Sequence, residues 1–145
     1  MKSRKLGNTG LYVPEVGFGA WAIGGKGWGS TADDEKAWEA LEISWDQGVR
    51  LFDTCDAYGD GHSEILLGKF LKGKRQKAVI VTKGGTNFRV QERSKNFERE
   101  YLFACLEESL RRLQTEYVDV YLLHVPDAAW QEKGLIWDTL KEMKQ

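Results

Sequence analysis

Short strand-like segments alternate with helix-like segments along the chain, and this alternation restricts the fold more than any other feature of the sequence. The strand-like segments are apolar and rich in β-branched residues, and they cover 16–21, 49–54, 78–83 and 118–124. Apolar residues at helical spacing predict helices over 30–47, 64–71, 98–113 and from about 130 onward. Strands separated by helices form βαβ units around a parallel sheet, so the predicted fold class is α/β.

The expected ends of these helices depend on capping residues. Ser30 or Thr31 is expected to begin and cap the first helix, and Ser63 the second, because their hydroxyl oxygens accept bonds from free amide groups. The last helix is expected to begin near Trp130. Before the first strand, two short segments around Gly7–Gly10 predict a β-hairpin, and the polar stretch 86–96 is expected to be a loop.

Polar residues occur where the predicted strands end. A doubly wound sheet and a (β/α)8 barrel both fit the order of elements, and in both the carboxyl ends of the strands meet at one edge that carries the site. The second strand ends at Asp53, the third at Lys83 and the fourth at His124, and Tyr58 lies in the loop after Asp53. We therefore expect these four side chains to lie close together.

This set of side chains suits the protonation of an oxygen atom on which negative charge develops. A tyrosine is a weak acid, but a nearby ammonium group stabilises its phenolate form. A carboxylate paired with that lysine keeps the ammonium charged and in place, and an imidazole donates a hydrogen bond to a carbonyl oxygen. Hydride addition to an aldehyde or a ketone develops such charge. Taken singly, each residue also has a structural explanation, such as capping, solvation or core packing.

Three motifs in the sequence resemble those of the aldo-keto reductases. The segment FDTCDAYG at 52–59, followed by GHSE at 61–64, is similar to the first signature of that family. VTKGG at 81–85 resembles its lysine-bearing strand, and 109–124 resembles the segment that enters its fourth strand. The resemblance implies the first half, about four strands, of a (β/α)8 TIM-type barrel after an N-terminal hairpin. Residues 1–145 are then a partial barrel domain whose C-terminal half is absent.

The resemblance also implies an oxidoreductase that reduces aldehydes or ketones to alcohols with NAD(P)H. In its tetrad Tyr58 is the general acid, Lys83 strengthens that acid, Asp53 pairs with Lys83, and His124 orients the carbonyl group. The implied contacts with the cofactor, NADPH or alternatively NADH, are Gly19, Ala20, Trp21 and Asp53. The implied contacts with the substrate are Trp21, Tyr58 and His124. No metal site is expected, and Cys55 stands where the family commonly has alanine.

Half a barrel is expected to need a partner. An open barrel exposes two unpaired strand edges and its apolar inner face, which favour association. We therefore expect this chain to pair with itself or with a separate C-terminal half. Two other interpretations stay open: a truncated or half-barrel protein without independent catalysis, and a cofactor-binding regulatory subunit.

The composition agrees with an enzyme of a reducing compartment. The net charge of the 145 residues is −1, so neither a nucleic acid nor a membrane surface is expected as a partner. The longest apolar stretches fall far short of the roughly 18 residues of a membrane span. Residues 1–7 lack the apolar core of a secretory signal. The two isolated cysteines fit a reducing cytosol, so the expected location is the cytoplasm.

Overall fold

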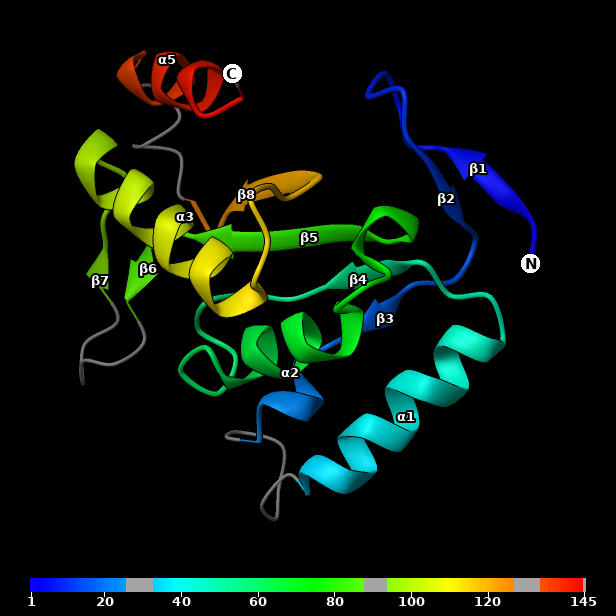
Figure 1. Ribbon diagram of the computed structural model, residues 1–145. Helices are drawn as coiled ribbons and strands as arrows, with labels where there is room; N and C mark the ends of the chain where they lie inside the picture. Colours follow the sequence, from blue (N-terminus) through cyan, green and yellow to red (C-terminus); the bar gives the residue numbers. More distant parts are fainter. Residues whose placement is uncertain (26–32, 88–93, 127–133, 145) are drawn as a thin grey trace.

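The computed structural model describes residues 1–25, 33–87, 94–126 and 134–144, and its centre is a four-stranded parallel sheet (Figure 1). The strands are adjacent in the order β3 (Phe18–Gly19), β4 (Leu51–Asp53), β5 (Val79–Gly84) and β8 (Val120–Leu123). All four predicted strands are thus confirmed. Three of them are shorter than predicted, and β5 is shifted by one residue toward the C-terminus.

The order of the strands distinguishes the two architectures that fit the sequence. In a doubly wound sheet the order reverses beside the first strand, whereas in a (β/α)8 barrel each strand pairs with the next one along the chain. Here β3 pairs with β4, β4 with β5, and β5 with β8, always in parallel. The sheet therefore has the strand order of half a barrel, as the resemblance to the aldo-keto reductases implies.

The first long helix, α1 (Asp34–Asp46), starts later than expected. The carboxylate of Asp33 accepts bonds from two amide groups of the first turn and caps the helix. The prediction that Ser30 or Thr31 begins and caps it is therefore wrong, and both residues lie outside the described ranges. A carboxylate at this position also complements the helix dipole, which a hydroxyl group does not.

The second helix, α2 (His62–Leu71), follows Gly61, which has a φ of 89°. The prediction that Ser63 caps this helix is wrong. The buried Ser63 hydroxyl donates to the carbonyl oxygen of Ala20 at 2.8 Å and lies 2.9 Å from the Thr54 hydroxyl. Ser63 thus connects α2 to the chain that leaves β3 and β4.

The other helices within the described ranges are α3 (Arg99–Leu113), α5 (Leu135–Glu142) and the short η1 (Ala22–Gly24) and η2 (Arg75–Lys77). The prediction for α3 is correct to within one residue. The helix expected from about Trp130 starts only at Leu135, after Gly134, and Trp130 itself lies outside the described ranges. Among the described helices, none has the length and apolar character needed to cross a bilayer.

In the part of the chain that the structure describes, two antiparallel strand pairs accompany the sheet. The first, β1 (Ser3–Lys5) with β2 (Tyr12–Pro14), confirms the hairpin expected at the N-terminus. The second, β6 (Thr86–Asn87) with β7 (Ser94–Lys95), lies in the stretch expected to be only a loop. Its strands have two residues each and little apolar pattern, so the sequence carried no signal for them.

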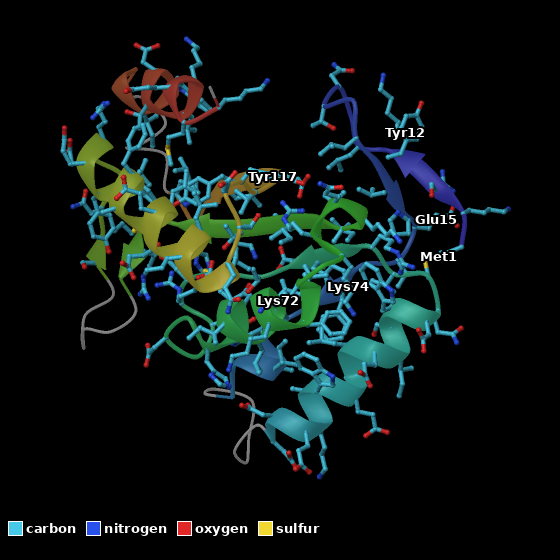
Figure 2. The ribbon with its side chains drawn as sticks, viewed as in Figure 1. Met1, Tyr12, Glu15, Lys72, Lys74 and Tyr117 are labelled. Carbon is cyan, nitrogen blue, oxygen red and sulfur yellow. The ribbon has the colours of Figure 1, made fainter. Side chains whose placement is uncertain are left out.

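The main hydrophobic core lies between the sheet and the helices that cover it. Phe52 of β4 and Ile80 of β5 are fully buried in it. The helices contribute Ala37, Leu41, Leu66, Leu67, Phe70, Leu71 and Leu113. At the end of α2, Lys74 (Figure 2) covers the edge of this core, with Nζ 3.5 Å from the centre of the Phe70 ring.

A buried ion pair joins α2, α3 and β5. Glu64 is fully buried, and its Oε2 accepts a bond from Arg112 Nε at 2.6 Å. Its Oε1 accepts a bond from the Thr82 hydroxyl at 2.6 Å, and Arg112 also donates to the Ser109 hydroxyl at 3.2 Å. The network therefore fixes Thr82, the residue that precedes Lys83 in β5.

The two faces of the sheet differ in burial. The residues of β5 that face the helices are buried, and those that face the other way are half-buried. Val81 and Lys83 belong to the second set, and the register places Asp53 beside Val81 on the same face. Leu122 of β8 pairs with Lys83 and is 42 % exposed. This face would be the inside of a closed barrel, and here it is only partly covered, as expected for half of one.

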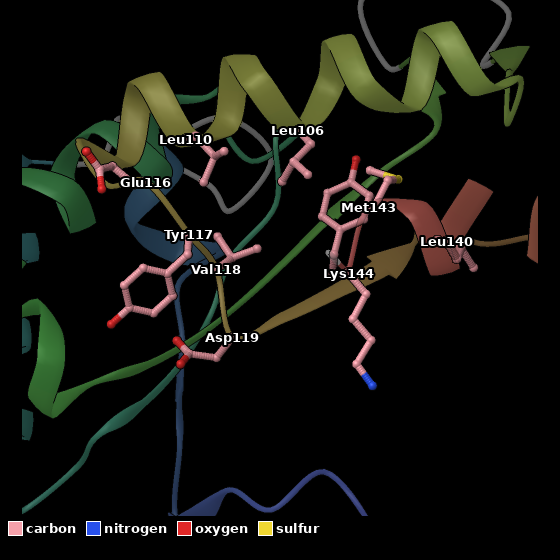
Figure 3. Close-up of a pocket in the computed structure, with 10 residues that line it drawn as sticks. Leu106, Leu110, Glu116, Tyr117, Val118, Asp119, Leu140, Met143 and Lys144 are labelled. Atoms are coloured by element: carbon pink, nitrogen blue, oxygen red, sulfur yellow. The ribbon is translucent and has the colours of Figure 1, made fainter. Parts of the chain in front are cut away.

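A cavity of about 610 Å³ lies between α3, β8 and α5 (Figure 3). It is lined by Leu106 and Leu110 of α3, by Leu140 of α5, by Met143 and Lys144 just after α5, by Tyr121 of β8, and by residues 116–119. Because residues 116–119 precede β8, this cavity lies at the amino end of the strand. The predicted catalytic residues lie at the carboxyl ends of the strands, so the cavity is separate from them.

Candidate active site

Three of the predicted catalytic side chains meet at the carboxyl end of the sheet. Lys83 Nζ lies 2.7 Å from Asp53 Oδ1 and 3.2 Å from Tyr58 Oη. It also donates to the carbonyl oxygen of Thr54 at 3.0 Å. An ammonium group has three protons to donate, and here it has three acceptors. Lys83 therefore holds a fixed position between a carboxylate and a phenol.

The pairing of β4 with β5 explains why these residues meet. Asp53 lies opposite Val81, and Lys83 follows two residues later on the same face of β5. The Lys83 side chain is 15 % exposed and that of Asp53 is 43 % exposed. The pair thus lies at the boundary between the buried sheet and solvent, where a small molecule can reach it.

Lys83 remains positively charged at this position. Burial favours the neutral amine, but the hydrogen bonds to Asp53 and Tyr58 and the negative charge of Asp53 outweigh it. The pKa of Lys83 therefore lies above its ordinary value of 10.5. The site accordingly keeps a full positive charge beside the Tyr58 hydroxyl at neutral pH.

Two glycines let the loop that carries Tyr58 approach η1. A Cβ atom on Gly59 would lie only 1.8 Å from the carbonyl oxygen of Gly24, and Gly59 has a φ of 64° that favours glycine. The Tyr58 ring stacks on the Trp21 ring, with 6.1 Å between centroids. The close approach of Gly24 and Gly59 thus positions Tyr58 beside Trp21.

His124 completes the predicted group. Its ring stands edge-on to the Tyr58 ring, with 6.3 Å between centroids. Its amide group donates to the carbonyl oxygen of Gly84 at 2.8 Å, and its carbonyl oxygen accepts a bond from the Thr86 hydroxyl at 2.5 Å. The structure therefore brings all four predicted residues together and anchors the backbone of His124 on both sides.

The residues expected to contact the cofactor differ in accessibility. Apart from its chain neighbours, no described residue has an atom within 4 Å of the position that a Cβ of Gly19 would take, and Trp21 is 48 % exposed. Ala20, in contrast, is fully buried, and its amide group donates to the carbonyl oxygen of Asp53 at 2.8 Å. Contact of Ala20 with a cofactor stays a prediction, and its burial makes Gly19 and Trp21 the stronger candidates.

Cys55 also lies in the site, although it is not among the residues predicted for it. Cys55 is fully buried, and its Sγ lies 2.9 Å from His124 Nδ1 and 3.1 Å from Asp56 Oδ1. Burial, together with the negative charge of Asp56, holds the pKa of Cys55 far above its ordinary value. Burial also raises the pKa of Asp56. Its position in the sequence could have indicated this, because Cys55 comes two residues after Asp53, at the sheet edge where the polar residues gather.

The chain is similar to known proteins both in its sequence and in its structure. The sequence model of the Aldo/keto reductase family matches residues 15–145. Aldo-keto reductase YhdN of Bacillus subtilis is 38% identical over 129 residues, which are 88% of this chain and 39% of that protein. The holo form of aldo-keto reductase AKR11C1 from Bacillus halodurans has a TM-score of 0.88 at 33% identity, covering 100% of this chain and 47% of that one.

A third relative is an aldo-keto reductase from Klebsiella pneumoniae in complex with NADPH. It has a TM-score of 0.70 at 28% identity, with 98% of this chain and 46% of that chain covered. The present chain thus spans less than half the length of each of these three relatives.

Proposed function

The chain belongs to the aldo/keto reductase family, and on that premise we propose that its site serves the NAD(P)H-dependent reduction of aldehydes or ketones to alcohols. Tyr58 is the general acid, and Asp53, Lys83 and His124 support it. One observation carries most of this proposal: Lys83 Nζ lies within hydrogen-bond distance of both Asp53 Oδ1 and Tyr58 Oη, at 2.7 and 3.2 Å.

Tyr58 holds the proton that the carbonyl oxygen takes up. As negative charge grows on that oxygen, Tyr58 Oη donates its proton and becomes a phenolate. The Lys83 ammonium group, 3.2 Å away, stabilises the phenolate by its opposite charge. Asp53, 2.7 Å from Lys83 Nζ, keeps that ammonium charged and in place. In the reverse direction the phenolate accepts the proton of an alcohol.

His124 and Trp21 flank Tyr58 and define the space for the substrate. The His124 ring, edge-on to Tyr58, donates a hydrogen bond to the carbonyl oxygen and orients it toward Tyr58 Oη. The half-exposed Trp21 ring, stacked on Tyr58, provides an apolar wall. These groups suit a small carbonyl compound with an apolar substituent.

NADPH is the proposed cofactor, and NADH is the alternative. When bound, its nicotinamide ring supplies the hydride that adds to the carbonyl carbon. Gly19, Trp21 and Asp53 are the residues proposed to hold that ring. Their fit is supported by the open space over Gly19, which lets a flat ring approach the backbone, and by the exposure of Trp21. A related aldo-keto reductase from Klebsiella pneumoniae is a complex with NADPH.

A half-barrel without independent catalysis is the second candidate. It is favoured by the 42 % exposure of Leu122 on the inner face of the sheet. In that case the site acts only after association with a second copy or a separate C-terminal half. A cofactor-binding regulatory subunit is the third candidate, and its sign is NADPH binding without turnover.

The proposal is tested by reduction of small aldehydes, measured as loss of NADPH absorbance with the purified chain. Tyr58→Phe keeps the aromatic ring but removes the proton donor, so we expect kcat to fall by about 10²–10⁴-fold. Tyr12→Phe is the matched control, because Tyr12 is 69 % exposed on the N-terminal hairpin and remote from the site (Figure 2).

The outcomes separate the three candidates. Turnover that depends on Tyr58 but not on Tyr12 supports the reductase. Saturable NADPH binding without turnover supports the regulatory subunit, and absence of binding supports a half-barrel that requires association. Equal turnover by wild type and Tyr58→Phe would contradict the assignment of Tyr58 as the general acid.

A further inference from the structure

The contact between Cys55 and His124 has no part in the mechanism above. Cys55 Sγ and His124 Nδ1 are 2.9 Å apart, although 69 residues separate them in the sequence. Cys55 is fully buried in the loop after β4, and His124 directly follows β8. The backbone of His124 is already anchored to Gly84 and Thr86. These backbone bonds do not determine the orientation of the imidazole ring or which of its two nitrogens carries the proton.

We infer that Cys55 is a positioning residue: its thiol donates a hydrogen bond to His124 Nδ1, so that the imidazole carries its proton on Nε2. This inference rests on the proposed function, because orientation of a carbonyl oxygen requires a donor on Nε2, the ring nitrogen that is not bonded to Cys55. The nitrogen that faces the substrate then always carries a hydrogen.

The surroundings of the sulfur atom support this direction of the bond. Three polar atoms lie near Sγ: His124 Nδ1 at 2.9 Å, which accepts a bond when it carries no proton, and two acceptors, Asp56 Oδ1 at 3.1 Å and the carbonyl oxygen of Lys83 at 3.6 Å. Nδ1 is the nearest of them. The amide group of Ala57 already donates to Sγ at 3.4 Å. A proton on Nδ1 would make the sulfur accept a second bond and would leave a bare Nε2, which cannot donate to a carbonyl oxygen.

Burial keeps Cys55 in the form that can donate. Removal from water disfavours the thiolate, so the pKa of Cys55 lies far above its ordinary value and the S–H group persists at neutral pH. The same burial argues against a Cys55–His124 nucleophile pair. Such a nucleophile needs a thiolate and access to substrate, whereas Cys55 is 0% exposed.

The short distances also distinguish a hydrogen bond from a metal site. Cys55, Asp56 and His124 place possible ligand atoms within 4.8 Å of one another. Two ligands on a tetrahedral zinc ion, with bonds of about 2.3 and 2.1 Å, are about 3.6 Å apart. The observed distances from Sγ to His124 Nδ1 and Asp56 Oδ1, 2.9 and 3.1 Å, are those of direct hydrogen bonds. The positive charge of Lys83, which acts electrostatically on Cys55, adds repulsion against a cation.

The inference is tested by NMR of the chain labelled with ¹⁵N in its histidine rings. The chain has only two histidines, and His62→Gln assigns the signals of His124. Long-range ¹H–¹⁵N correlation at pH 8 shows which ring nitrogen carries the proton. We expect the wild type to have a single neutral form protonated on Nε2. In Cys55→Ala both neutral forms should be populated, and in Cys55→Ser, which keeps a donor, the single form should return.

Cys105→Ala is the matched control, because Cys105 is the other free cysteine and is only half-buried. It should leave the His124 signals unchanged. Where the chain turns over, kcat of Cys55→Ala should fall at least about twofold, in proportion to the lost fraction of the competent form, with recovery in Cys55→Ser. The NMR result needs no cofactor or turnover, so failure of the proposed function is detected separately. A proton on Nδ1 in the wild type, or an unchanged proton position in Cys55→Ala, would overturn the inference.

Discussion

Replacement of Arg112 by methionine should strongly destabilise the fold, because it breaks the buried ion pair between α3 and α2. Arg112 Nε donates to Glu64 Oε2 at 2.6 Å, and Glu64 is fully buried. Methionine has a similar length but no charge, so Arg112→Met leaves a buried carboxylate whose remaining donor, among the described residues, is the Thr82 hydroxyl at 2.6 Å. The carboxylate then has to stay buried without a countercharge or take up a proton.

The expected cost follows from the burial of both partners. The side chains of Arg112 and Glu64 are 8 % and 0 % exposed. Removal of one partner from a buried ion pair costs about 3–5 kcal/mol, because the other charge stays buried. Folding free energies of small domains are about 5–15 kcal/mol, so the loss is a large part of the total. In Glu64→Gln/Arg112→Met no charge is buried, so the double variant should lose less than Arg112→Met alone.

Urea denaturation followed by circular dichroism measures these differences. Arg111→Met is the matched control, because Arg111 is the neighbouring residue, 70% exposed, and it pairs with Glu108 on the helix surface. It should have almost no effect on the free energy of unfolding. The reasoning is refuted if Arg112→Met lowers the midpoint no more than Arg111→Met, or if the double variant is the least stable of the three.

Three further predictions concern other parts of the chain. Burial raises the pKa of Cys55, so above pH 9.0, the ordinary pKa of the thiol, the folded state keeps a proton that the unfolded state loses. The free energy of unfolding of the wild type should therefore fall relative to that of Cys55→Ala by about 1.4 kcal/mol per pH unit above pH 9.0, and not below it. Urea melts at several pH values measure this difference. Gly59→Ala should lower stability by about 2–4 kcal/mol in thermal melts, because its Cβ would lie 1.8 Å from Gly24 O at a φ of 64°. Gly7→Ala is the control: the space around its added Cβ is open, so it should lower stability by only about 1–2 kcal/mol. Because the inner face is only half covered, the chain should self-associate at micromolar concentration, which light scattering detects. Leu122→Lys should shift the chain toward the monomer. A monomeric wild type would contradict this prediction.

The sequence predicted the parts of the fold that depend on local pattern and on topology. Each strand was visible as a short β-branched segment, and α3 as an apolar stripe that ends at Leu113. Because parallel strands have their carboxyl ends at one edge, Asp53, Lys83 and His124 could be placed together before any distance was known. The bonds from Lys83 Nζ to Asp53 and Tyr58 agree with that placement.

The features that the sequence did not reveal depend on contacts between distant segments. Serine favours the cap position of helices, but Ser63 is buried beside Thr54, and its hydroxyl donates to the Ala20 carbonyl oxygen. Glu64 and Arg112 are 48 residues apart and each looks like a solvated helix residue. Their pairing becomes evident only when α2 and α3 are packed together, because nothing in the local pattern marks either as buried.

The cap of α1 illustrates a different difficulty. Ser30, Thr31 and Asp33 all belong to residue types that favour the cap position, and they lie within four positions of one another. Their helix-capping preferences are similar, so the sequence could not choose among them. The structure selects Asp33, whose side chain bonds to the amide groups of the first turn.

The central claim is that this site transfers a hydride to a carbonyl carbon while Tyr58 protonates the oxygen. Mass spectrometry of the alcohol formed from a small aldehyde and NADPH deuterated at C4, prepared separately in both C4 configurations, tests it most directly. We predict one deuterium on the carbinol carbon with one of the two configurations, at a rate that falls about 10²–10⁴-fold in Tyr58→Phe. Alcohol without deuterium from either configuration, or the same labelled yield from wild type and Tyr58→Phe, would contradict the account.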